Sequence, residues 1–154
     1  MTSGSQIRTS SVAEIREKWQ LIGPQHAHWF AVPVGTRGRA HLAAELRALE
    51  HGAAVVLCDS QFGSRRRCRA VARGGGVALT REFVALPTLV KAVLLVQDAP
   101  ETARYVADCL LAPPPVATAV GRAQRYLTPI LQVVARSRTR AVLLPGRVVF
   151  GHRA

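Results

Sequence analysis

Arginines are concentrated in one short segment of this chain, at a spacing that would place several of them side by side. Arg65, Arg69 and Arg73 recur every four residues, so on a helix they form one positively charged face, with Arg66 next to it. Guanidinium groups suit bidentate binding of phosphate or carboxylate, and the first turn of a helix favours anions. The segment is therefore a candidate surface for nucleic acid or another polyanion. The alternative is a solvated helix face.

A carboxylate stands just before this segment. Asp59 follows the apolar run from Ala53 to Leu57, which is typical of a strand buried in a parallel sheet. Open α/β sheets bind ligands beyond the carboxyl ends of their strands, so Asp59 is the candidate ligand-site residue. The alternative is a loop carboxylate that caps the next helix or pairs with Arg65 or Arg66.

Other catalytic chemistry has little support in the sequence. No Gly-x-Ser-x-Gly elbow and no phosphate-binding Walker loop is present, so the catalytic residues remain unknown. His26 and His28 would point to the same side of an extended segment, and His41, His51 or Asp59 could add a ligand. None of these stands at a recognisable metal-ligand spacing, so no metal site is predicted.

The chain is strongly basic, with a formal net charge of +12 over 154 residues. Only Lys18 and Lys91 are lysines, and the arginines extend from Arg8 to Arg153. A charge of this size attracts polyanions at low salt. The excess of arginine, with abundant alanine, valine, glycine and proline, is equally consistent with a GC-rich coding sequence.

Cysteine usage and hydropathy indicate a cytoplasmic protein. Cys58, Cys68 and Cys109 are odd in number and widely spaced, as expected of free thiols in a reducing compartment. No secretory leader is recognised at the N-terminus, and no apolar run is long enough to predict a membrane span. We expect a flexible N-terminus over residues 1–9 and one α/β domain over 10–154.

The order of elements predicts an α/β fold. Helices are predicted over 11–22, 39–51, 63–73, 98–111 and 117–127, and strands over 28–34, 53–57, 77–86 and 89–96. Residues 35–38 are predicted to form a turn, and 148–150 to return as a hairpin partner of 141–144. We therefore predict a small, mostly parallel, Rossmann-like sheet flanked by helices, with a helical and hairpin-like C-terminal portion.

Two sequence segments between residues 28 and 98 resemble those of a known family. The first is the helix and strand from Leu42 to Leu57 with a turn at Gly52, and the second runs from Phe62 through Gly74 to Pro87. This order resembles the second half of an actinobacterial class I S-adenosylmethionine-dependent methyltransferase. The resemblance implies an antiparallel last strand, placed at Lys91 to Gln97, and no catalytic residue carries over.

The same resemblance implies that half of the family's site is missing. The glycine-rich cofactor loop and the acidic ribose ligand of that family have no counterpart before Trp29. S-adenosylmethionine is then expected to bind only if another chain supplies that half. A sheet without its neighbouring strands exposes an edge, so homo- or hetero-oligomerisation through that edge is expected. The alternative function is a non-enzymatic cationic module that binds nucleic acid or another polyanion.

Overall fold

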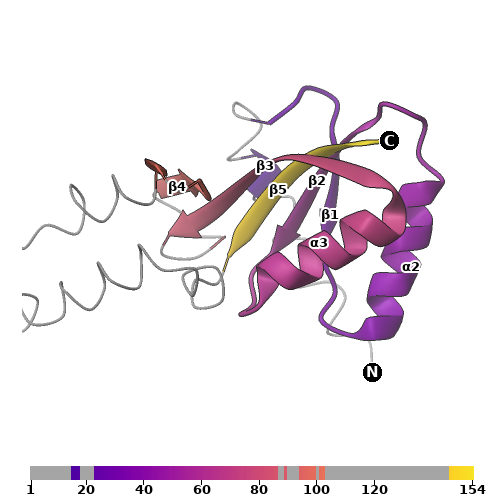
Figure 1. Cartoon of the computed structure of the whole chain (residues 1–154), viewed down its shortest axis with the longest axis horizontal. Coiled ribbons are helices and arrows are strands. Elements are labelled where there is room, and N and C mark those ends of the chain that lie inside the picture. The colour runs from indigo at the N-terminus through magenta and orange to yellow at the C-terminus, as the bar shows by residue number, and fades with distance from the viewer. Residues whose placement is uncertain (1–14, 18–22, 87–88, 90–93, 100, 103–145) are drawn as a thin grey trace, which may run out of the picture.

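The structure is a computed structural model that describes residues 15–17, 23–86, 89, 94–99, 101–102 and 146–154 (Figure 1). Five strands form one open sheet in the order β1-β2-β5-β3-β4. The strands are β1 (His28–Ala31), β2 (Ala54–Asp59), β3 (Val77–Leu86), β4 (Leu94–Gln97) and β5 (Arg147–Arg153). The helices with described bounds are α2 (Thr36–Arg47) and α3 (Ser64–Gly75).

The sheet is mixed, which corrects the prediction of a mostly parallel one. β1 and β2 are parallel, whereas β5 is antiparallel to both β2 and β3, and β4 is antiparallel to β3. The α/β class predicted from the sequence is confirmed. The predominance of parallel pairing is wrong, because the last strand in the chain enters the sheet in the reverse direction.

β5 lies in the middle of the sheet, between β2 and β3 (Figure 1). Cys58 pairs with Val148 on one side of it, and Phe83 pairs with Val148 on the other. The predicted hairpin role of 148–150 is therefore wrong for the described part of the chain, because β5 pairs with strands far away in the sequence. The residues proposed as its hairpin partner, 141–144, lie outside the described residues.

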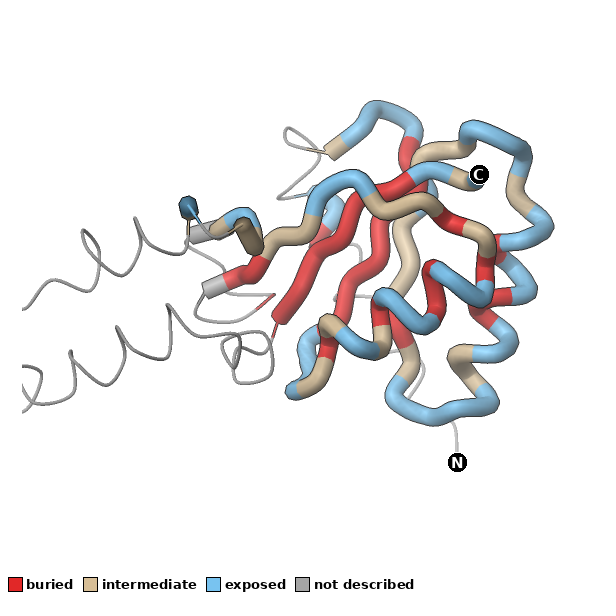
Figure 2. The backbone as a smooth tube through the Cα atoms, in the orientation of Figure 1, coloured by how far each residue is buried: buried red, intermediate tan, exposed pale blue. Residues whose placement is uncertain are grey.

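Both described helices lie on one face of the sheet (Figure 1), and apolar side chains fill the space beneath them. Leu46 from α2 and Val71 from α3 meet Val55 and Leu57 of β2 and Val149 of β5 in one buried cluster. Alternation along a strand sends every second side chain to this face, which explains why these residues share it. Figure 2 shows that the buried residues are concentrated on the central strands and on the sheet-facing sides of the helices.

A second apolar cluster covers the opposite face. Val56 and Cys58 of β2 pack there with Val148 and Phe150 of β5. The ring of Phe83 meets that of Phe150 edge-on, with 5.3 Å between centroids. Residues 15–17 are helical, and Ile15 is buried in the same cluster, so this part of the predicted helix over 11–22 is confirmed and the remainder lies outside the described residues.

Two glycine positions correct predicted boundaries. Residues 35–38 do not form a turn, because α2 begins at Thr36 and Gly38 belongs to its first turn. A Cβ at Gly38 would lie 2.8 Å from the Cβ of Pro33, so glycine permits this close approach. Likewise α3 continues through Gly75 and ends at Gly76, whose φ of 65° is left-handed.

Other predicted elements are confirmed with shifted bounds. The strand predicted over 77–86 coincides with β3, and the strand predicted over 89–96 is reduced to β4 in the described residues. Glu101 and Thr102 are helical, as predicted after Asp98. The rest of that helix and the helix predicted over 117–127 lie outside the described residues.

Candidate functional site

Asp59 is the last residue of β2, as predicted, and its buried carboxylate is held by Arg67. The Nε of Arg67 donates to one carboxylate oxygen at 2.7 Å, and its Nη2 donates to the other at 3.0 Å. The amide of Gln61 also donates to this carboxylate at 2.9 Å. The hydrogen bond to Asp59 raises the pKa of Arg67 above its usual value. This pairing corresponds to the alternative of an arginine-bound loop carboxylate, with Arg67 in place of Arg65 or Arg66.

The local backbone explains why Arg67 is the partner. Gly63 adopts a left-handed φ of 76°, which turns the chain from the end of β2 into α3. α3 then begins at Ser64, and Arg67 lies one turn into the helix, over the end of the strand. The Ser64 side chain is buried, and its hydroxyl has no hydrogen-bond partner among the described residues.

A second charged cluster lies beside Asp59, around Arg147, which is the residue paired with Asp59 in the register of β2 and β5. The Arg147 side chain is fully buried, and its Nη1 donates to Glu82 of β3 at 3.1 Å and to Asp98 at 2.7 Å. Its Nε and Nη2 have no hydrogen-bond partner in the part of the chain that the structure describes. Because Arg147 begins β5, this contact joins the central strand to β3 and to the residue that follows β4.

Two arginines of the predicted cationic face reach the same carboxylates. The Nε of Arg69 lies 2.6 Å from Glu82, and the Nε of Arg65 lies 3.5 Å from Glu82 and 3.7 Å from Asp98. Helical spacing therefore does place Arg65 and Arg69 on one side of α3. That side faces carboxylates on the sheet, so much of its charge is compensated within the protein.

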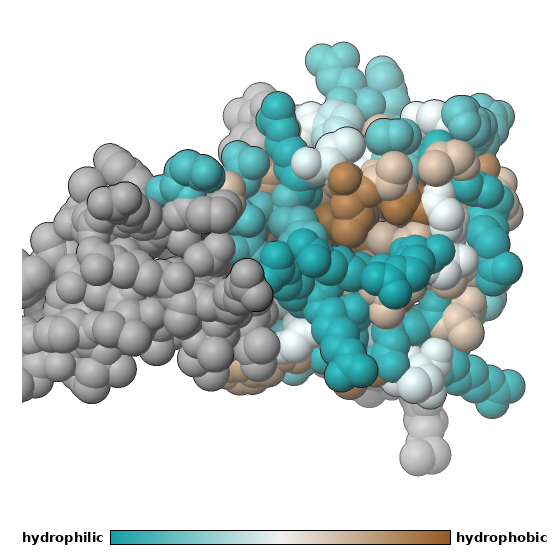
Figure 3. Space-filling view, viewed as in Figure 1, coloured by the Kyte–Doolittle hydropathy of each residue, from teal (hydrophilic) through white to brown (hydrophobic). Residues whose placement is uncertain are grey.

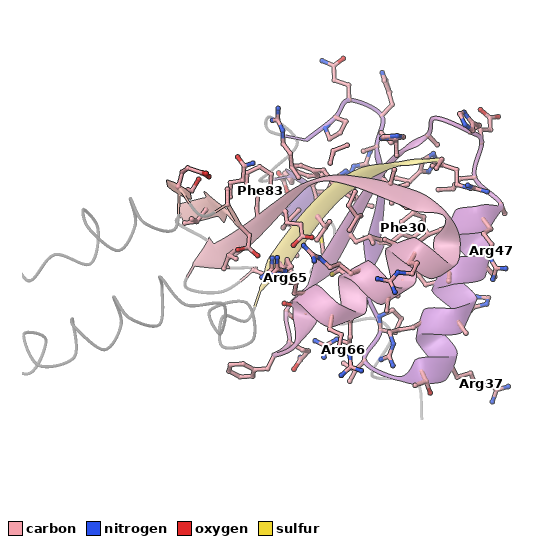
Figure 4. The ribbon with its side chains drawn as sticks, in the orientation of Figure 1. Phe30, Arg37, Arg47, Arg65, Arg66 and Phe83 are labelled. Carbon is pink, nitrogen blue, oxygen red and sulfur yellow. The ribbon has the colours of Figure 1, made fainter. Side chains whose placement is uncertain are left out.

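The remaining arginines of the segment face solvent. Figure 4 shows Arg65 between α3 and the strands, whereas Arg66 points away from the sheet. Arg66 and Arg73 are exposed, and neither has a hydrogen-bond or ion-pair partner among the described residues. The four predicted anion-binding residues are thus divided between an internal charge cluster and the open surface.

A groove of about 540 Å³ lies between α3 and β3. Arg69 and Arg73 border it from the helix and Arg81 from the strand, while Ala72, Val77 and Leu79 supply apolar surface. Gln97 and Asp98 border its end beside β4. Figure 3 shows a hydrophobic area over this part of the molecule, surrounded by hydrophilic side chains.

The two described cysteines are buried on opposite faces of the sheet and are free thiols. Burial raises the pKa of Cys68 to about 12, with a further contribution from the charge of Asp59. Burial also raises the pKa of Cys58 well above its usual value. Neither thiol is suited to act as a nucleophile, because the reactive form is the thiolate.

The histidines do not assemble a metal site in the described part of the chain. No group of three or more His, Cys, Asp or Glu side chains with metal-binding geometry is found there. His26, which has a φ of 61°, borders a small pocket of about 290 Å³ with Arg16 and Trp29. Among the described residues there is also no helix of the length and apolarity that a bilayer crossing requires.

Sequence reasoning missed Arg147 and Glu82 and assigned Asp98 a different role. Arg147 is one arginine among many, and only its position at the start of the apolar run Val148 to Phe150 distinguishes it. Glu82 is the sole acidic residue of the strand predicted over 77–86, which is a usable signal. Asp98 was predicted only as the first residue of the helix over 98–111, and its carboxylate accepts a hydrogen bond from Arg147.

Comparisons with protein-family models, with curated proteins and with solved structures found no match to this chain.

Proposed function

We propose that this chain is a methyltransferase-like sheet domain that lacks the usual cofactor-binding half, is inactive alone, and works with a partner chain. The observation that carries the proposal is the open edge of β1. Among the described residues β1 pairs only with β2, although the sheet behind it is well packed and largely buried. An unpaired edge presents backbone groups that a second chain can satisfy.

The backbone of β1 is oriented for such pairing. The amide of Val32 donates to the carbonyl of Cys58 on β2 at 2.8 Å. Since backbone groups alternate in direction along a strand, Phe30 shares this orientation, and the amides of Trp29 and Ala31 face the open edge. The His28 side chain is exposed, and those of the three following residues are half-buried.

The strand order is also in keeping with the resemblance. An antiparallel last strand is expected of the methyltransferase half, and β5 is antiparallel and last in the chain. It is Arg147–Arg153 and not Lys91 to Gln97, although β4 (Leu94–Gln97) is antiparallel to β3 as well. This topology supports the proposal, while the carboxylate expected near the ligand, Asp59, is occupied by Arg67.

Calorimetric titration with S-adenosylmethionine tests whether the chain alone lacks a cofactor-binding site. The purified chain is first stripped of bound nucleic acid at high salt and checked for folding by circular dichroism. We expect no heat of binding, because no described loop offers a cofactor cradle. One-to-one binding at micromolar concentration would contradict the proposal and restore an independent enzyme.

Sedimentation across a range of protein concentrations tests whether the chain associates through the edge of β1. We expect association that Ala31→Pro abolishes, because proline removes an edge-facing amide without breaking a bond to β2. Val34→Pro is the matched control, since Val34 is exposed and lies just beyond β1. Association that survives Ala31→Pro would exclude this edge as the contact.

The second candidate function is binding of nucleic acid or another polyanion, favoured by Arg66 and Arg73, which are exposed and have no partner among the described residues. Arg65 and Arg69 contribute less, because Glu82 compensates them. Binding of a single-stranded DNA 12-mer should then fall steeply with salt, and Arg66→Glu with Arg73→Glu should reduce the salt slope. A salt slope that this double variant leaves unchanged would argue against α3 as the nucleic-acid surface.

A further inference from the structure

The outer edge of β3 is covered over less than half of its length. β3 contains ten residues, and β4 pairs only with its last four, Phe83 to Leu86. Figure 1 shows β4 beside the C-terminal end of β3 only. Among the described residues no strand accompanies Val77 to Arg81 on that side, although β5 pairs with them on the other.

The groove between α3 and β3 lies along this uncovered part. Its borders include Val77, Leu79 and Arg81 from β3, and it ends at Gln97, the last residue of β4. A strand placed in the groove would therefore continue the line of β4 along β3. Such addition of an extended segment to an open sheet edge is a common mode of peptide recognition, with affinity from the main chain and specificity from side-chain contacts.

The charges beside the groove define the chemistry of the segment. Glu82 and Asp98 already contact three arginines, including the fully buried Arg147. Arg73 and Arg81 add positive charge that no described residue compensates. The groove consequently has a surplus of guanidinium groups, which pair well with carboxylates. Ala72, Val77 and Leu79 provide apolar contact between these charges.

We propose that an extended acidic segment of a partner protein adds to the open edge of β3, with its carboxylates on Arg73 and Arg81. This site is separate from the edge of β1 and does not depend on the methyltransferase-like proposal. The bulge in pairing between Leu79 and Arg81 is the competing explanation, because bulges and charged side chains also protect edges from association.

Fluorescence polarisation with the full chain tests the proposal. The probe is a fluorescein-labelled heptapeptide that alternates glutamate with valine, so that one side carries charge and the other is apolar. We expect saturable one-to-one binding, and little binding of the same peptide with glutamine in place of glutamate. Absence of binding by the acidic peptide would overturn the proposal and favour a protected edge.

Charge-reversal variants locate the site. Arg73→Glu combined with Arg81→Glu should weaken binding by roughly tenfold or more, because carboxylates would then face carboxylates. Arg37→Glu combined with Arg66→Glu is the matched control, since both arginines are exposed and neither borders the groove. Equal weakening by the two double variants would show general charge attraction and overturn the assignment.

Two further probes separate strand addition from other binding. A peptide with N-methylated valines keeps every side chain but loses main-chain donors, so its binding should be strongly reduced. Unreduced binding would overturn strand addition. A single-stranded DNA 12-mer that binds through Arg73 and Arg81, and displaces the peptide at lower concentration, would overturn the peptide in favour of nucleic acid.

Discussion

The two described helices lie on the same face of the sheet and have the same length, yet they are attached to it by different interactions. α2 contributes Leu42 and Leu46 to an apolar cluster, and its side-chain contact between His41 and Glu45 lies on its own exposed surface. α3 shares the apolar cluster through Val71, but its arginines also bond carboxylates on the strands.

The difference is that apolar packing holds α2 against the sheet, whereas directional hydrogen bonds also fix the position of α3. Apolar contacts are non-directional, so α2 could shift slightly and keep most of its burial energy. A bidentate arginine–carboxylate pair holds only over a narrow range of geometry, so the contact of Arg67 with Asp59 fixes how the start of α3 lies over the strand ends. The contact of Arg69 with Glu82 also borders the groove, where a precise surface is needed for recognition.

The largest effect is expected where the charged attachment is most buried. Arg147→Met keeps side-chain length but removes the guanidinium that bonds Glu82 and the buried carboxylate of Asp98. Urea unfolding should show a loss of about 4 kcal/mol, because removing one partner from a buried cluster of charges is strongly destabilising. Arg47→Met on the exposed side of α2 is the control and should change stability by less than about 0.5 kcal/mol. A loss below about 1 kcal/mol for Arg147→Met would mean that the cluster does not anchor β5.

Leu46→Ala tests the apolar attachment of α2. Leu46 is fully buried against β2, so its truncation should cost about 3 kcal/mol from lost burial and the cavity left behind. Equilibrium unfolding in urea measures this loss. Ala44→Gly, on the exposed side of the same helix, should cost only about 1 kcal/mol through helix propensity. Equal costs for the two variants would deny α2 an apolar anchor.

Asp59→Asn tests the charged attachment of α3 at the end of β2. The variant keeps the shape of the side chain but cannot accept both hydrogen bonds from Arg67. We expect a loss of about 2 kcal/mol, smaller than for Arg147 because Arg67 is partly exposed and can be hydrated. Faster amide hydrogen exchange in the first turn of α3, with α2 unchanged, should accompany it. Faster exchange in both helices would contradict the separation drawn here.

The smallest effect is expected just above pH 9, through the buried thiols. The pKa of Cys68 is raised from 9.0 to about 12 in the folded chain, so the unfolded chain loses this proton first. Stability should therefore be intact below about pH 9 and fall gradually above it, because only the unfolded chain loses this proton there. Cys68→Ala should reduce the slope of stability against pH between 9 and 12. An unchanged slope would exclude this thiol as the cause.

Local patterns in the sequence were sufficient to predict the strands that lie under α2 and α3. The apolar run before Asp59 and the long run from Val77 identified β2 and β3, because the pattern of apolar residues that marks a buried strand is local in the sequence. The boundary at Gly38 was missed because its glycine serves a contact with Pro33, not a turn. In the sequence, a glycine that permits two segments to approach closely cannot be told from a glycine in a loop.

Long-range pairing explains the remaining errors. The run Val148 to Phe150 was identified as strand, but nothing local shows that it pairs with β2 and β3. The mostly parallel sheet was predicted wrongly for the same reason. In the candidate site, Asp59 was found from its position after a strand. Its partner Arg67 was not, because the choice among neighbouring arginines depends on where α3 starts.

The central position of β5 has a consequence for the order in which the protein can assemble during synthesis. A nascent chain made only as far as Gln97 contains β1 to β4, but β2 and β3 have no common neighbour until Arg147–Arg153 has been translated. Until then the chain holds two separate strand pairs whose inner edges are open to solvent, a state prone to wrong association. The sheet is completed only after translation has passed β5, by contacts as distant in sequence as Ala54 with His152, so a slow, chaperone-sensitive final step is built into its topology.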